Sequence, residues 1–98
     1  MSGANAVRGE AEVAGQVLRP SFAALVAAEG EIGSLFELVD RAADGRLALS
    51  EMVALFWHCL RDPAAVDRAA FSEAVAAGGL ARATPALKLL LRQILDGQ

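Results

Sequence analysis

The chain has 98 residues, of which 55% are hydrophobic and 5% aromatic, and its formal net charge is −3. A chain of this length has room for one domain with one hydrophobic core. The nine Lys and Arg residues do not cluster on one predicted face, so nucleic-acid binding is not expected. The single cysteine, Cys59, excludes an internal disulfide and any multi-cysteine metal site.

The sequence shows no pattern of a targeting or membrane-spanning segment. The first ten residues contain no apolar run, so a secretory signal is not expected. No stretch reaches the roughly 18 uninterrupted apolar residues that a membrane span needs. We therefore expect a cytoplasmic protein without membrane contact. Residues 1–8 are small and polar and are expected to be flexible, and residues 9–98 are expected to form one domain.

The first predicted element is a short β-hairpin. Ala14 and Gly15 lie between two short runs that contain Val13 and Val17, which is typical of a tight turn between two strands. Pro20 ends the second strand, because proline has no N–H to donate to a strand partner.

A first helix is predicted to follow the hairpin and to run to about Gly30, with Ser21 as its N-cap. Its apolar face is formed by Phe22, Leu25 and Val26. Glu29 falls on the same face, and two interpretations stay open. Its side chain either reaches water at the edge of this face or accepts hydrogen bonds from the N–H groups that begin the next helix.

Ser34 and Glu37 have the spacing of a capping box, which predicts a second helix to about Ala43. The residues expected to face inward are Leu35, Phe36, Leu38, Val39 and Ala42. Ser50 is predicted to cap a third helix over Glu51–Arg61, the most apolar of the chain. Its broad apolar arc contains Met52, Val53, Leu55, Phe56, Trp57, Cys59 and Leu60.

Two further helices complete the prediction. One runs from about Asp67 to Ala77 and ends at Gly78-Gly79. The last has Thr84 as its cap and Pro85 at its first position, and runs to about Leu95. The fold class predicted is α+β, mainly α, with a short N-terminal β-hairpin followed by four or five packed helices.

The segment Asp40–Glu51 matches several positions of an EF-hand calcium loop. Asp40, Asp44 and Glu51 take positions 1, 5 and 12, and Gly45 takes position 6. Alanines replace the oxygen ligands of positions 3 and 9, which leaves fewer than the six to eight oxygens that Ca²⁺ needs. A degenerate, calcium-responsive binding module is therefore kept as an alternative.

No catalytic arrangement is predicted. His58 and Cys59 are neighbours on a helix and point about 100° apart, so they cannot act as a base and nucleophile on each other. A histidine on the polar face and a cysteine in the core are expected instead. The sequence contains no glycine-rich phosphate loop and no Ser/His/Asp set. We expect neither enzymatic activity nor a cofactor or metal.

The last helix is apolar on two sides, because Leu89 lies opposite its other leucines. Met52 and Trp57 lie on or at the edge of the third helix's apolar arc. A chain of this size has difficulty burying all of these side chains, which predicts that Met52, Trp57 and Leu89 contact a partner. The alternative is that all three belong to an ordinary core.

The order of these features resembles a known family. The resemblance rests on Arg8-Gly9-Glu10 before the hairpin, Leu18–Leu25, Gly33–Leu38, Met52–Phe56 and the Gly-Gly-Leu80 break. Together they are similar to small tail proteins of gene transfer agents and related siphophage-type prophages. These belong to the phage tail assembly chaperone group, which is also labelled as tail tube proteins.

The resemblance implies a non-enzymatic cytoplasmic factor for virion assembly. Such a chaperone would bind the tape-measure protein and recruit tail tube subunits during tail morphogenesis. A structural component of the tail is the alternative that the second label implies, and a homo-oligomer is compatible with either. In that family the Asp40–Glu51 loop has the same spacing without calcium ligands.

Overall fold

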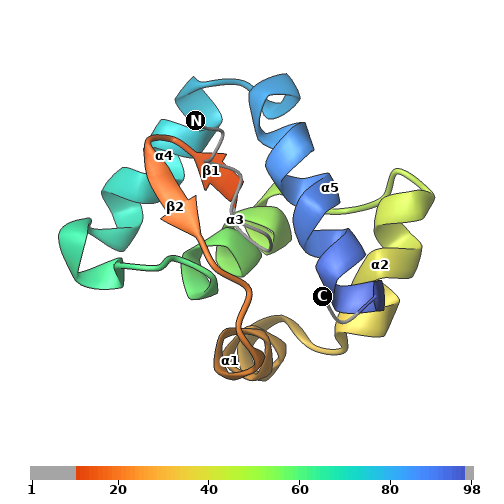
Figure 1. Ribbon diagram of the computed structural model, residues 1–98. Coiled ribbons are helices and arrows are strands. Elements are labelled where there is room, and N and C mark those ends of the chain that lie inside the picture. The colour runs from red at the N-terminus through yellow and green to blue at the C-terminus, as the bar shows by residue number, and fades with distance from the viewer. Residues whose placement is uncertain (1–10, 97–98) are drawn as a thin grey trace, which may run out of the picture.

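The computed structural model describes residues 11–96, so the predicted flexible segment 1–8 lies outside the described residues. The described chain forms a β-hairpin and five α-helices, as predicted for a mainly helical α+β domain (Figure 1). In chain order the elements are β1 (Ala11–Val13), β2 (Gln16–Leu18), α1 (Phe22–Ile32), α2 (Leu35–Ala43), α3 (Leu49–His58), a 3-10 turn (Pro63–Ala65), α4 (Arg68–Ala77) and α5 (Leu80–Asp96).

The two strands pair in antiparallel register, with Val13 opposite Gln16. The two residues between them both have positive φ, 52° for Ala14 and 78° for Gly15. This is the backbone of a two-residue turn whose twist matches that of the strands. Glycine adopts such a φ without a steric penalty, whereas alanine does so at a cost.

The outer edge of β2 is attached to the end of α3. Leu18 and Leu60 form an antiparallel bridge, and the Arg61 N–H donates to the Val17 carbonyl at 3.0 Å. The Arg19 N–H donates to the carbonyl of Cys59 at 2.6 Å. A two-stranded hairpin is marginal in water by itself, so these contacts hold it on the helical part of the domain.

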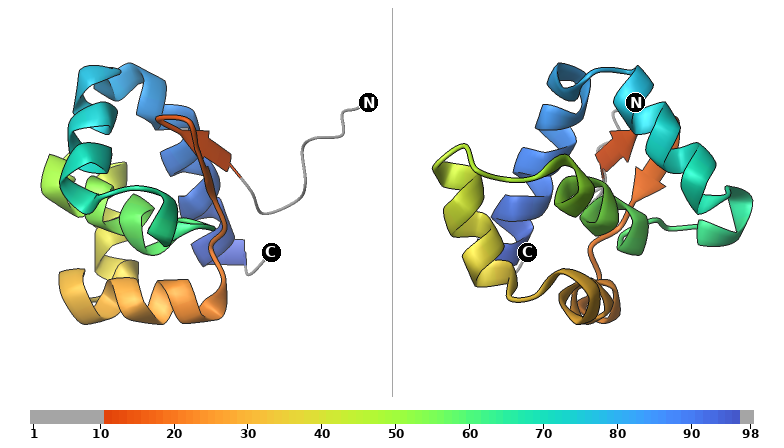
Figure 2. Two further views of the ribbon diagram at one scale, coloured as in Figure 1. Left: turned by 90° about the vertical axis from the view of Figure 1, so that its left-hand side faces the viewer. Right: turned by 180° about the vertical axis from the view of Figure 1, so that it is seen from behind.

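Helix α3 lies at the centre of the molecule, with α1 across one end of it and α4 beside it (Figures 1 and 2). Five consecutive α3 residues, Met52 to Phe56, are buried. The other elements turn their apolar residues toward this helix. They contribute Leu18, Ala28, Leu35, Leu38, Phe71, Val75 and Leu90. Each fully buried Leu or Phe side chain stabilises the fold by about 1.5–3 kcal/mol.

Two predicted helix starts are wrong. Helix α3 begins at Leu49 with Ala48 as its N-cap, so Ser50 lies in the first turn and does not cap it. The Glu51 carboxylate replaces a serine cap there, because it accepts a hydrogen bond from the Ala48 N–H at 3.1 Å. Helix α3 also ends at His58 rather than at Arg61.

Helix α5 begins at Leu80, directly after Gly79, whose φ is 88°. Thr84 is therefore inside the helix, and its hydroxyl donates to the Leu80 carbonyl at 2.9 Å rather than capping the chain. Pro85 follows in the second turn of the helix. At that position its missing N–H removes one hydrogen bond of the helix, and its ring crowds the carbonyl four residues before it, so this proline is unfavourable for the helix.

No single helix within residues 11–96 is long and apolar enough to cross a membrane. Helices α4 and α5 taken together reach that length and composition, but they are bent by 113° at the break between them.

Candidate interaction surfaces

The predicted capping residues near α1 and α2 form local hydrogen bonds. The Ser21 hydroxyl accepts from the Ala24 N–H at 3.1 Å, and the Ser34 hydroxyl accepts from the Glu37 N–H at 3.3 Å. The second hydrogen bond of the predicted capping box, from the Ser34 N–H to the Glu37 carboxylate, is not formed in the described chain.

The Glu29 carboxylate accepts a hydrogen bond from the Leu35 N–H at 3.0 Å. It therefore lies at the beginning of α2, where its negative charge also interacts favourably with the positive end of the helix dipole. Of the two interpretations of Glu29, the structure shows the hydrogen bond to the next helix. Ser21 and Ser34 thus cap α1 and α2, and the Glu29 carboxylate links the end of α1 to the start of α2.

The segment Asp40–Glu51 does not have the geometry of a calcium loop. Both oxygens of Glu51, the residue at position 12, accept hydrogen bonds from Arg41, at 2.5 and 2.6 Å. These bonds lower the pKa of the Glu51 carboxyl, with a further contribution from the Ala48 N–H. Among residues 11–96 no group of three or more His, Cys, Asp or Glu side chains is placed to hold a metal. The arrangement of these side chains therefore does not support the EF-hand alternative.

A polar cluster that the sequence did not predict joins three helices. The Glu31 carboxylate of α1 lies 2.7 Å from His58 Nε2 of α3 and accepts a hydrogen bond from Arg68 of α4 at 2.5 Å. The hydrogen bond from Arg68, followed by that from His58, lowers the pKa of Glu31 to about 2. The guanidinium of Arg68 also lies 5.8 Å from the centre of the Trp57 ring. Partners so far apart in sequence give no local pattern from which to find them.

The three predicted contact residues do not form an exposed apolar surface. Met52 is only 6% exposed and belongs to the core, so its assignment to a contact surface is wrong. Trp57 is half-buried between Arg68 and Phe71, whose ring centre lies 6.2 Å away. Leu89 is half-buried as well. A role of Trp57 and Leu89 in binding stays a prediction.

Large exposed apolar side chains occur elsewhere. Within residues 11–96 they are Phe22, Val26, Phe36, Leu49, Leu80 and Leu95. Phe22 and Phe36 are 84% and 70% exposed, although the sequence predicted that they, and Val26, face inward. In α2, Leu35 and Leu38 occupy the core side, and Phe36 is rotated by about 100° from Leu35.

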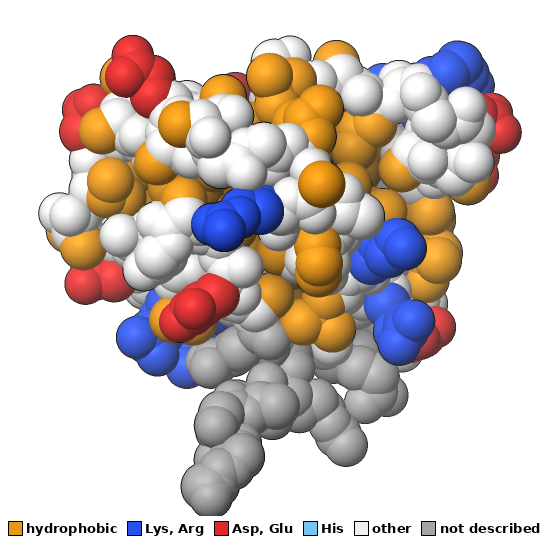
Figure 3. Space-filling model, turned by 90° about the horizontal axis from the view of Figure 1, so that it is seen from above, with side chains coloured by type: hydrophobic (Ala, Val, Ile, Leu, Met, Phe, Trp, Pro, Cys, Tyr) orange, Lys and Arg blue, Asp and Glu red, His pale blue; other side chains and the backbone are white. Residues whose placement is uncertain are grey.

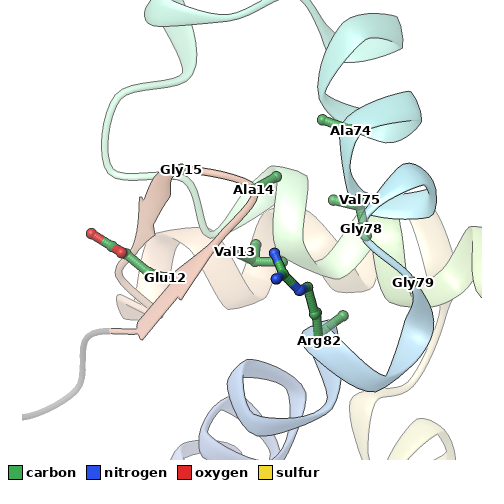
Figure 4. Close-up of a pocket in the computed structure, with 10 residues that line it drawn as sticks. Glu12, Val13, Ala14, Gly15, Ala74, Val75, Gly78, Gly79 and Arg82 are labelled. Atoms are coloured by element: carbon green, nitrogen blue, oxygen red, sulfur yellow. The ribbon is translucent and has the colours of Figure 1, made fainter.

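A shallow hollow of about 500 Å³ lies between the hairpin turn and the junction of α4 and α5. It is lined by small residues, including Ala14, Gly15, Gly78 and Gly79, together with Glu12, Val13, Val75 and Arg82. Figure 4 shows the Arg82 side chain extending from α5 toward Val13. The face of the molecule seen from above carries many hydrophobic side chains between scattered charges (Figure 3). Such a surface suits protein contact better than binding of a charged small molecule.

The comparisons with known proteins identify the family. The family described as "phage tail tube protein, GTA-gp10" matches residues 6–97. No curated protein and no solved structure matches the chain. The match covers the hairpin and all five helices of the described chain, in agreement with the resemblance found in the sequence. The chain therefore belongs to the family of phage tail tube proteins of the GTA-gp10 type.

Proposed function

We propose that this phage or gene transfer agent tail protein is a non-enzymatic tail assembly chaperone. It acts in the cytoplasm, where it binds the tape-measure protein and tail tube subunits during tail morphogenesis. The observation that carries the proposal is the exposure of large apolar side chains on a domain of this family. Side chains such as Phe22 and Phe36 gain the most from burial in a complex.

The polar groups support binding rather than chemistry. Cys59, the one thiol, is fully buried, and burial raises its pKa to about 12. The side chains of His58 and Arg68 both contact the Glu31 carboxylate, so their polar atoms are engaged within the chain. A partner with amphipathic helices, such as a tape-measure protein, offers the apolar faces that these exposed side chains would cover.

Co-expression tests the proposal. A tape-measure protein from the same phage or gene transfer agent is produced alone and together with this chain, and the soluble fraction of the tape-measure protein is measured. We expect a several-fold increase with the wild-type chain. The Phe36→Ser variant is expected to lose much of this effect. Ala43→Ser, an exposed change on the same helix, is the matched control. An unchanged soluble fraction with the wild-type chain would contradict the proposal.

The alternative is a structural tail component, as the family description allows. Quantitative mass spectrometry of purified particles separates the two. A chaperone is present during assembly and absent from finished particles. A constant number of copies per particle would instead support the structural role.

A further inference from the structure

We propose that the Glu31–Arg68 pair is a strap between α1 and α4, and that its opening uncovers Trp57 and extends a hollow along α3. The inference goes beyond the proposed function. It concerns how the chain controls access to its single tryptophan, and it requires no tape-measure or tail tube protein.

One face of α3 lies between α1 and α4. Residues four apart on an α-helix lie one above the other on the same face. A hollow of about 340 Å³ lies over this face, and Glu31 of α1 and Arg68 and Ser72 of α4 also line it. Two neighbouring rows of α3 residues form the face, namely Leu49, Val53 and Trp57, and Ser50, Ala54 and His58. The hollow covers the first two members of each row.

A pair of side chains, rather than packing, joins α1 to α4. Both helices pack against α3, but they pack little against each other. Within residues 11–96 the Glu31–Arg68 contact of 2.5 Å is the one direct ion pair or side-chain hydrogen bond between the two helices. The same Glu31 carboxylate lies 2.7 Å from Nε2 of His58, one turn beyond Ala54. The pair therefore crosses the face of α3 at the level of His58 and bounds the hollow on that side.

Arg68 connects this strap to Trp57. Its guanidinium donates to Glu31, and the guanidinium carbon lies 5.8 Å from the centre of the Trp57 ring. A cation is attracted to the face of an aromatic ring, and the Glu31 carboxylate holds the guanidinium in the position where it covers the indole. When the pair separates, the Arg68 side chain is free to move away. The half-buried Trp57 ring then becomes accessible from the hollow.

The strap is able to open while the domain stays folded. The Arg68 and Glu31 side chains are 43% and 38% exposed. Ion pairs between partly exposed side chains contribute little to stability and are screened by salt. Helix α3 is held by the hydrophobic core, in which Leu55 and Phe56 are fully buried. Opening of the strap is therefore a local event and does not require unfolding of α3.

Acrylamide quenching of Trp57 fluorescence tests the proposal. The chain has one tryptophan, so the signal reports on this position alone. Glu31→Gln keeps the shape of the side chain and removes the charge that holds Arg68. We expect the quenching constant to rise about twofold, because the ring is uncovered for a larger fraction of the time. Glu73→Gln, an exposed change on α4, is the matched control and should leave it unchanged. Equal quenching in wild type and Glu31→Gln would overturn the proposal.

Salt tests the strap without a substitution. In the wild-type chain at a fixed pH, about 1 M NaCl should raise the quenching constant toward that of Glu31→Gln, because salt screens the ion pair. In Glu31→Gln the same salt should have little effect, since the charge that it screens is already absent. An equal salt response of the two chains would show that salt acts elsewhere, and would contradict the role given to Glu31.

Amide hydrogen exchange separates local opening from a general loss of stability. Circular dichroism first verifies that Glu31→Gln is folded. Exchange in this variant should become several-fold faster at the end of α1 and the start of α4, whereas the amides of Leu55 and Phe56 should change less. A uniform acceleration over all helices would mean that the whole domain is destabilised, and the strap would be refuted. Because these measurements use the isolated chain, their failure is distinct from a failure of the chaperone proposal.

Discussion

Arg41 and Glu51 join the end of α2 to the start of α3 through two parallel hydrogen bonds, of 2.5 and 2.6 Å. The same carboxylate also accepts the Ala48 N–H, so one side chain begins α3 and holds α2 beside it. The interaction between a guanidinium and a carboxylate that share two parallel hydrogen bonds is stronger than a single hydrogen bond between neutral groups.

Glu51→Gln should therefore lower the melting temperature, because the uncharged amide cannot accept both guanidinium hydrogen bonds. Glu73→Gln, on the exposed side of α4, is the control and should have little effect. In the wild-type chain, millimolar Ca²⁺ should leave the melting temperature unchanged in differential scanning calorimetry. A rise on adding Ca²⁺ that disappears in Glu51→Gln would contradict this assignment of Glu51.

The Glu31 carboxylate predicts a specific pH dependence of stability. Its pKa is about 2 in the folded chain and about 4.5 in the unfolded chain, so the unfolded chain binds the proton more tightly. The contribution of Glu31 to the free energy of unfolding is fully present above about pH 4.5 and decreases as the pH falls toward 2. Urea denaturation of wild type and Glu31→Gln between pH 2 and 6 measures it. The variant should lose less stability over that range, and equal losses would show that the cluster is not formed.

Phe71 and Phe36 make a matched pair for stability. Phe71 is 1% exposed and packs in the core, so Phe71→Ala should reduce the free energy of unfolding by about 3–5 kcal/mol. Phe36 lies mostly in solvent, so Phe36→Ala should change it by about 0.5 kcal/mol or less. Denaturant titration of both variants measures the difference. Similar losses would mean that α2 packs with its other face inward.

The turn residue Ala14 offers a stabilising substitution. Its φ of 52° is costly for alanine and well tolerated by asparagine. Ala14→Asn should raise the free energy of unfolding by roughly 0.5–1 kcal/mol. Gly15→Ala is the opposite case, because φ at that position is 78°, and should lower it. A loss of stability in Ala14→Asn would indicate a different turn.

The Cys59 thiol should react slowly. Burial raises its pKa to about 12, so the reactive thiolate is scarce at pH 8, and the sulfur is also inaccessible. Ellman's reagent should therefore modify the native chain much more slowly than the chain in urea. Equal rates would show that the end of α3 opens readily.

Sequence patterns predicted the hairpin, four or five helices and the apolar centre of α3, because each has strong local signals. They did not predict correctly which side of α1 is buried. That helix is apolar on nearly all sides, so periodicity cannot choose between Phe22 and Ala28, and packing against α3 decides. At α5 the Thr84-Pro85 pair has the chemistry of a helix start, yet the helix begins at Leu80, after Gly79.

The candidate interaction surfaces were predicted least well. A chain of this size leaves several large apolar side chains outside its core, and which of them stay exposed depends on packing between distant segments. Met52 is drawn into the core by the elements around α3, while Phe36 is left outside. The contacts of Glu31 with His58 and Arg68 likewise exist only after three helices have assembled.

The bridge between Leu18 and Leu60 has a consequence for how the chain is made. The hairpin leaves the ribosome early, but the segment that fixes its outer edge is synthesised only after α3. Until then β2 presents an unpaired edge, which other strands can join. Because a hairpin alone is marginal in water, we expect it to become stably ordered only once Leu60 and Arg61 have left the ribosome and joined it.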